Sequence, residues 1–180
     1  LTKEIGLKYL KDDFNFNFAL YQRDASDIID YVRNNETQPW QASNIREIIT
    51  NGFEFNMGYK FYLGAFRPQS INIGYSNIND DLLETDFAFS RYALNSLKNQ
   101  ITATYIFQVR DFISSTLTFK NSKRLNSESY NVIDFRTSYM YDKFIISIIL
   151  NNILDAEYSE TNLVPMPGFN SLVELKYSIN

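Results

Sequence analysis

The residues that could carry chemistry in this chain are carboxylates, because its 180 residues include no histidine and no cysteine. A Ser–His or Cys–His catalytic arrangement, a thiolate metal site and a His-ligated metal or haem are therefore excluded within this segment. Two acidic clusters, Asp24–Asp27 and Asn79–Asp81, could offer oxygen ligands to Ca²⁺, but neither has EF-hand spacing. Glu157 and Glu160 could form the carboxylate pair of a glycosidase, although no neighbouring motif supports one. We expect solvated surface at these positions, with no catalytic residue, metal site or cofactor.

Three other residues are candidates for contact with a ligand. Trp40, the one tryptophan, lies in the polar segment 34–43 beside Pro39, and its ring offers a wide contact at low entropy cost. The alternative is that Trp40 anchors its loop or belongs to an aromatic belt at a membrane interface. Arg91 and Tyr92 lie where a long polar connection rejoins a strand, so they could meet an anionic ligand.

Polar and apolar residues alternate along most of the chain, which is typical of strands with one wet and one apolar face. Phe14–Arg33 and Asn44–Leu63 are the longest alternating stretches. In the second, Phe53, Phe55 and Met57 oppose Glu54, Asn56 and Lys60. The pattern predicts an all-β antiparallel meander of about nine strands and no helix. The polar residues expected to share the wet face are Asn15, Asn17, Glu54, Asn56, Lys60, Asp134 and Arg136.

Strand length and loop length favour a transmembrane barrel over a soluble β-sandwich. Sandwich strands run about five to six residues, and the two longest stretches are far longer. A tilted β-strand needs about 9–11 residues to span a membrane, so these stretches are long enough to cross one. Short and long connections also alternate, as they do in outer-membrane barrels. The expected short turns are 11–13, 64–68, 108–111 and 141–143, and the expected long loops are 34–43, 77–91, 120–130 and 156–170.

Charge and hydropathy narrow the class of protein further. The net charge of -4 leaves no basic footprint for nucleic acid. No apolar run approaches the 18–20 residues, roughly, of a membrane helix. The start, Leu1–Glu4, is no signal peptide, yet an outer-membrane protein must be exported. We expect either that the numbering begins after processing or, preferably, that the chain is the tail of a longer one.

The closing stretch 144–180 carries the most specific motif. Asn152-Ile153-Leu154-Asp155, with Tyr158 and Glu160, is followed by Val164-Pro165-Met166-Pro167-Gly168-Phe169 and by a strand in which Val173, Leu175, Tyr177 and Ile179 share one face. This order and spacing resembles the C-terminus of TonB-dependent outer-membrane receptors. Tyr21–Tyr31 (YQRDASDIIDY) and 40–54 resemble strands of the same family. The chain departs from the family at Asn180, where an aromatic residue usually stands.

The resemblance implies that residues 1–180 are the C-terminal portion of a transmembrane β-barrel with about 22 strands, without its plug domain and earlier strands. It implies a receptor in the outer membrane of a Gram-negative bacterium, not an enzyme, that takes up a ferric siderophore, cobalamin or similar nutrient. The implied partners are outer-membrane lipid, the rest of the barrel and plug, TonB through the missing N-terminal part, and a large nutrient ligand. A passive porin-like or adhesin barrel and a soluble all-β binding module are the alternatives.

Overall fold

A single antiparallel sheet makes up the fold of this computed structural model. The structure describes residues 1–64, 67–83, 88–90, 97–125, 127–160 and 164–179. Its strands are β1 (Thr2–Lys11), β2 (Phe14–Arg33), β3 (Gln41–Leu63), β4 (Arg67–Leu83), β5 (Phe89–Ser90), β6 (Leu97–Arg110), β7 (Ile113–Arg124), β8 (Tyr130–Tyr141), β9 (Phe144–Asn151) and β10 (Asn170–Tyr177). Within the described ranges, no helix is long and apolar enough to cross a membrane.

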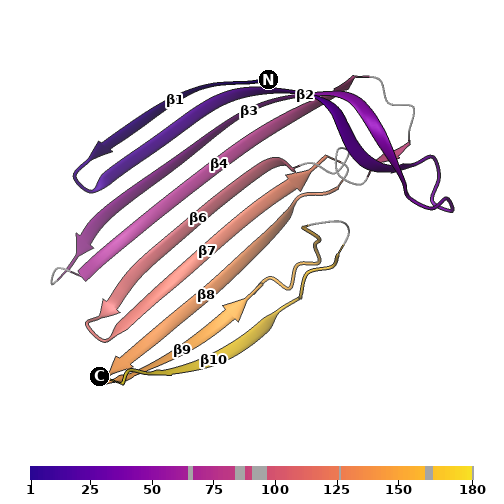
Figure 1. Cartoon of the computed structure of the whole chain (residues 1–180). Helices are drawn as coiled ribbons and strands as arrows, with labels where there is room; N and C mark the ends of the chain where they lie inside the picture. Colours follow the sequence, from indigo (N-terminus) through magenta and orange to yellow (C-terminus); the bar gives the residue numbers. More distant parts are fainter. Residues whose placement is uncertain (65–66, 84–87, 91–96, 126, 161–163, 180) are drawn as a thin grey trace.

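The strands follow one another in a meander, because each pairs with its neighbour in the chain in the order β1-β2-β3-β4-β6-β7-β8-β9-β10. The two-residue β5 lies off this path and pairs with the far end of β2. Figure 1 shows a curved sheet whose short turns gather at one end, while the long connections gather at the other. The predicted all-β meander, its nine main strands and the alternation of short and long connections are confirmed.

Several predicted boundaries were wrong. β3 begins at Gln41 rather than Asn44, and β6 continues to Arg110, so the turn predicted at 108–111 lies at 111–112.

Two predicted long connections were also partly strand. The segment 77–91 was expected to be a long polar connection, but β4 continues to Leu83. Its residues stay paired with β3 as far as Leu83, which lies opposite Glu47. The segment 120–130 was expected to be a loop, but β7 continues through Arg124. Backbone pairing with a neighbouring strand stabilises these polar segments, so their Asn, Asp and Ser residues do not end the strand.

The sheet has one mainly apolar face and one mainly polar face, because register aligns like residues across strands. One aligned row on the apolar face is Phe16, Met57, Ile73, Ala103, Phe119 and Ile133. The neighbouring row on the polar face is Asn17, Asn56, Gly74, Thr102 and Lys120. The seven residues predicted to share the wet face all lie on this polar face, since opposed residues of antiparallel strands point to the same side.

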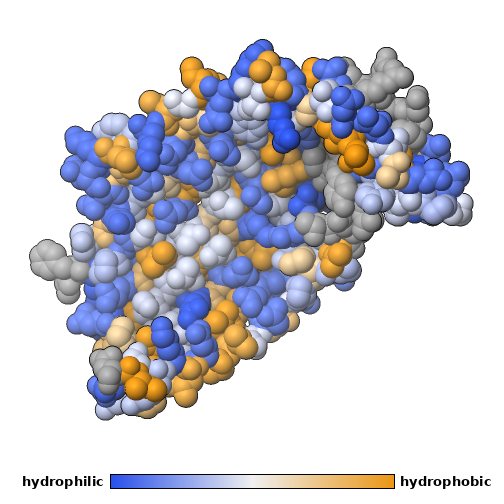
Figure 2. Space-filling model, in the orientation of Figure 1, coloured by the Kyte–Doolittle hydropathy of each residue, from blue (hydrophilic) through white to orange (hydrophobic). Residues whose placement is uncertain are grey.

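The apolar face is not covered by a second layer of the described chain. On the central strands the side chains of this face are mostly half-buried by their neighbours in the sheet, and on the edge strands they are exposed, as Ile5 at 71% and Val173 at 72% show. Aromatic pairs lie near the short turns of this face, among them Phe112 with Tyr139 (5.5 Å between ring centroids) and Phe144 with Tyr177 (4.8 Å). Figure 2 shows one face of the molecule, on which hydrophilic side chains predominate and hydrophobic ones gather along the rim beside β10. An apolar face of this extent needs a partner that is itself apolar.

Candidate functional site

The polar face forms a wall of hydroxyl, amide and charged groups across all nine main strands. On β8–β10 the guanidinium of Arg136 donates to Glu174 Oε2 (2.7 Å) and to Ser147 Oγ (3.2 Å). The hydroxyls of Ser138 and Ser147 are 2.9 Å apart. These contacts pair the charges of Arg136 and Glu174 within the polar face.

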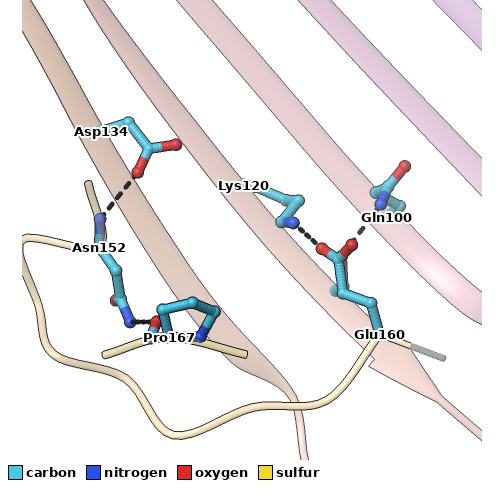
Figure 3. A network of polar contacts seen from close by, with 7 residues as sticks. Gln100, Lys120, Asp134, Asn152, Glu160 and Pro167 are labelled. Atoms are coloured by element: carbon cyan, nitrogen blue, oxygen red, sulfur yellow. Dashed lines mark hydrogen bonds and ion pairs between the residues drawn. The ribbon is translucent and has the colours of Figure 1, made fainter. Parts of the chain in front are cut away.

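At the end of β9, Asn152 fixes the start of the long connection to β10. Its side chain is buried and its φ is +48°, a left-handed conformation in which Asn is among the better tolerated residues. The Asn152 backbone N–H donates to Asp134 Oδ1 of β8 (2.8 Å). The side-chain nitrogen donates to the carbonyl oxygens of Ala156 (2.9 Å) and Pro167 (3.2 Å), and the side-chain oxygen accepts from Ala156 N–H (2.9 Å). One side chain therefore joins both ends of the connection (Figure 3).

Asp155 repeats this arrangement one turn later. Its φ is +50°, and its Oδ1 accepts a hydrogen bond from Phe169 N–H (2.7 Å). A Cβ atom added to Gly168 would lie 2.5 Å from the same oxygen, so glycine leaves the space that the carboxylate occupies. Farther along the connection, the backbone N–H of Met166 donates to the carbonyl oxygen of Tyr158 (2.9 Å). The connection is thus closed by its own polar groups.

A cation and two tyrosines attach this connection to the polar face. Lys120 of β7 forms an ion pair with Glu160, and Figure 3 shows the two side chains pointing toward each other. The rings of Tyr130 and Tyr158 stack with centroids 4.5 Å apart, and Lys120 Nζ lies 5.3 Å from the Tyr158 ring. Burial, which outweighs the opposing attraction of the Lys120 ammonium, raises the pKa of the Tyr158 phenol. The phenol therefore remains neutral at physiological pH.

The residues of the closing motif are therefore structural in this sheet. Asn152, Asp155, Tyr158 and Glu160 were noted in the sequence for their spacing, but their roles were not derivable from it. Lys120 was not singled out, because a lone lysine in a polar strand carries no sequence signal of a partner 40 residues away. We name the set formed by Lys120, Tyr130, Asn152, Asp155, Tyr158 and Glu160 the loop latch.

Trp40 lies at the base of the β2–β3 hairpin tip. The guanidinium of Arg33 sits 4.5 Å from the centroid of its ring, a cation–π contact. At the tip, Asn35 Oδ1 accepts from the backbone N–H groups of Thr37 and Gln38. The indole is half-buried in this turn. The other two candidate contacts, Arg91 and Tyr92, lie outside the described residues.

The acidic candidates are placed as follows. Asp24 and Asp27 lie on β2, and Asp80 accepts a hydrogen bond from Thr50 Oγ1 (2.6 Å). Glu160 is held by Lys120, and Glu157 is exposed in the connection. In the part of the chain that the structure describes, no group of three or more candidate ligands could hold a metal ion.

Comparison with known protein families gave a match over residues 1–153, to the family described as TonB dependent receptor-like, beta-barrel. A comparison with curated protein sequences gave no match. The family match covers β1 to β9 and ends just after Asn152.

Solved structures share the fold. The siderophore receptor PirA from Acinetobacter baumannii superposes with a TM-score of 0.73 at 17% identity, covering 99% of this chain and 31% of that one. PiuA, a siderophore receptor of the same organism, gives 0.70 at 17% identity, with coverage of 98% and 28%. The FrpB iron transporter from Neisseria meningitidis (F3-3 variant) gives 0.68 at 16% identity, with coverage of 98% and 30%. The chain therefore spans under a third of the length of these proteins, and the likeness is one of fold.

Proposed function

Because the chain belongs to the TonB-dependent receptor family, we propose that it builds part of the wall of an outer-membrane receptor for TonB-energised uptake of a scarce nutrient. The two-faced sheet carries this proposal. Its apolar face would meet lipid, and its polar face would line the lumen, where the plug domain and passing cargo lie. The family is one of transport receptors, so the cargo would be bound and moved rather than chemically changed.

The dimensions of the apolar face support a membrane span. On β3 the apolar side chains run from Phe53 to Leu63, which is about 33 Å along a strand at roughly 3.3 Å per residue. A strand tilted by about 45° turns this length into about 23 Å along the membrane normal, close to the apolar band of roughly 25 Å in outer-membrane barrels. The remaining residues of β2 and β3 would project from the membrane with the long loops.

The open edges of the sheet support a larger barrel. β1 and β10 each pair with one neighbour in the described sheet, and a sheet in hydrocarbon must close so that no backbone group lacks a partner. We propose that these strands are the last nine of a barrel of about 22. The earlier strands, the plug domain and the segment that contacts TonB would lie upstream.

A ferric siderophore is the first cargo to test, and cobalamin is the second. The similar structures are described as siderophore receptors and an iron transporter, and this likeness supports testing iron compounds first. The experiment is uptake of ⁵⁵Fe-labelled siderophores and labelled cobalamin in wild-type cells, cells lacking the gene and cells lacking TonB. We expect wild-type cells to accumulate one of these cargoes, and both mutants to fail to accumulate it. Accumulation that needs the gene but not TonB would indicate a passive pore instead.

Trp40 is proposed to contact the cargo at the mouth of the barrel, together with Arg91 and Tyr92. The Arg33–Trp40 pair places a cationic and an aromatic group side by side at one hairpin tip. Trp40→Ala is expected to weaken cargo binding by about tenfold, in line with roughly 1.4 kcal/mol for one aromatic contact. Trp40→Phe, which keeps a ring, is the matched control. If both variants bind as wild type in a cell-surface binding assay, Trp40 serves only to anchor the hairpin.

A further inference from the structure

A row of side-chain amides crosses the apolar face of the sheet at its long-loop end. On six strands an Asn or Gln stands two residues beyond an apolar residue of that face. These residues are Gln22 on β2, Asn51 on β3, Asn77 on β4, Asn99 on β6, Asn121 on β7 and Asn131 on β8. We name this row the amide belt.

The belt is assembled by hydrogen bonds between neighbouring strands. Gln22 Nε2 donates to Asn51 Oδ1 (3.0 Å), and Asn121 Nδ2 donates to Asn131 Oδ1 (2.8 Å). Asn77 donates to Asn99 in the same way. Each primary amide has two N–H donors and an oxygen with two lone pairs. A cross-strand pair therefore keeps both donors and acceptors for a molecule outside the sheet.

A groove of about 520 Å³ joins the belt to the apolar band below it. Its apolar side is formed by Ile5, Leu20 and Phe53, and its polar side includes Gln22 and Asn51. Lys3, Asn77 and Asn79 also line it. The groove thus offers an apolar floor and an amide-rich upper edge to one amphipathic ligand.

The charges around the belt nearly cancel. Lys3 is opposed to Gln22, and Lys123 is opposed to Asn99. Asp24, two residues beyond Gln22, and Asp81, four residues beyond Asn77, both lie opposite Ile49 on the same face. An anionic headgroup would meet as many carboxylates as ammonium groups. A neutral, hydroxyl-rich headgroup matches the amides better, because a hydroxyl also donates and accepts.

The other end of the same face is built differently. There the ring pairs Tyr9–Phe14 and Phe144–Tyr177 lie beside the short turns, as in the aromatic girdle of many membrane proteins. The two boundaries of one apolar band therefore present different chemistry to what surrounds them. Resting on the proposed membrane location, we propose that the amide belt binds the saccharide headgroup of a glycolipid whose acyl chain lies along the groove.

The test is native mass spectrometry of the full-length protein, extracted from membranes in detergent and mixed with two lipids. Digalactosyldiacylglycerol carries a saccharide without charge, and phosphatidylglycerol with the same acyl chains carries a phosphate without a saccharide. We expect the saccharide lipid to occupy the protein about tenfold more, as one or two net hydrogen bonds would give. Equal occupancy of the wild-type protein by both lipids, or preference for phosphatidylglycerol, would overturn the proposal.

The double variant Gln22→Leu with Asn51→Leu removes one amide pair together, so neither partner is left unpaired. It is expected to lose most of the preference for the saccharide lipid. The matched control is Asn17→Leu with Asn56→Leu, a register-opposed pair on the polar face, which should keep that preference. If the Gln22/Asn51 double variant keeps the preference for the saccharide lipid, the amide belt is not the binding site. A protein found outside the membrane fraction would instead contradict the proposed function.

Discussion

At the scale of single residues, Asn152 shows how one side chain can close a long connection. It is buried, adopts a positive φ of +48°, and makes side-chain hydrogen bonds to Ala156 and Pro167. The sequence indicated that this position belongs to a motif, because its spacing resembles that of a family. It could not indicate the hydrogen bonds, because Pro167 is 15 residues away and only the folded connection brings it near.

Asn152→Ala is expected to destabilise the folded protein by about 2–4 kcal/mol, since it removes the side-chain hydrogen bonds and leaves buried backbone groups unsatisfied. The measurement is gel electrophoresis of unheated samples, in which the folded protein migrates differently from the unfolded one. The urea concentration at which the folded band disappears gives the midpoint. Asn72→Ala is the control, because Asn72 is exposed on the polar face and bonds only to Ser70 among the side-chain contacts described. Equal midpoints for the two variants would show that Asn152 does not close the connection.

The Lys120–Glu160 pair offers a second test of the loop latch. Both side chains are partly exposed, at 24% and 35%, so solvent screens their attraction and a double-mutant cycle should give only about 0.5–1 kcal/mol. Lys120→Met, Glu160→Gln and the double variant complete the cycle, and urea midpoints supply the free energies. Additive effects would mean that the stacked tyrosines, rather than the ion pair, hold the connection.

At the scale of elements, the β2–β3 hairpin is the part of the sheet that alternation predicted best. Strand β2 runs from Phe14 to Arg33, the predicted bounds, and β3 begins only three residues earlier than predicted. Prediction was poorer at 77–83 and 120–124, where polar residues suggested loops. Alternation shows which part of a strand has an apolar face. Backbone pairing can extend past that part into water, as long as the adjacent strand is equally long.

Asp27 is a backbone exception within that hairpin. Its φ is +56°, and the β2–β3 register resumes unchanged on both sides of it, at Ser26 and Ile28. A β-branched residue is strained at such a φ, so Asp27→Val should cost about 1–3 kcal/mol locally. Asp27→Gly should be tolerated. The measurement is hydrogen exchange of the amides between residues 28 and 44, which should accelerate in the Val variant alone. Unchanged exchange would mean that the hairpin adapts without the left-handed residue.

At the scale of the whole molecule, the sheet has one mainly apolar side and one mainly polar side. Sequence alternation was sufficient to predict this, because side chains change sides at every residue of a strand. It could not predict what covers the apolar face, since a lipid bilayer and a second protein layer select the same residues. The family match over residues 1–153 and the exposed aliphatic side chains favour lipid.

The most direct test is site-directed spin labelling along β3 of the full-length protein in lipid bilayers. The chain has no cysteine, so single cysteines can be placed in this segment at Phe53, Glu54, Phe55, Asn56 and Met57. We expect labels at positions 53, 55 and 57 to collide mainly with oxygen dissolved in lipid, and labels at 54 and 56 to collide mainly with a water-soluble nickel chelate. Positions 53, 55 and 57 shielded from both reagents would show that protein covers the apolar face, and would contradict the receptor wall.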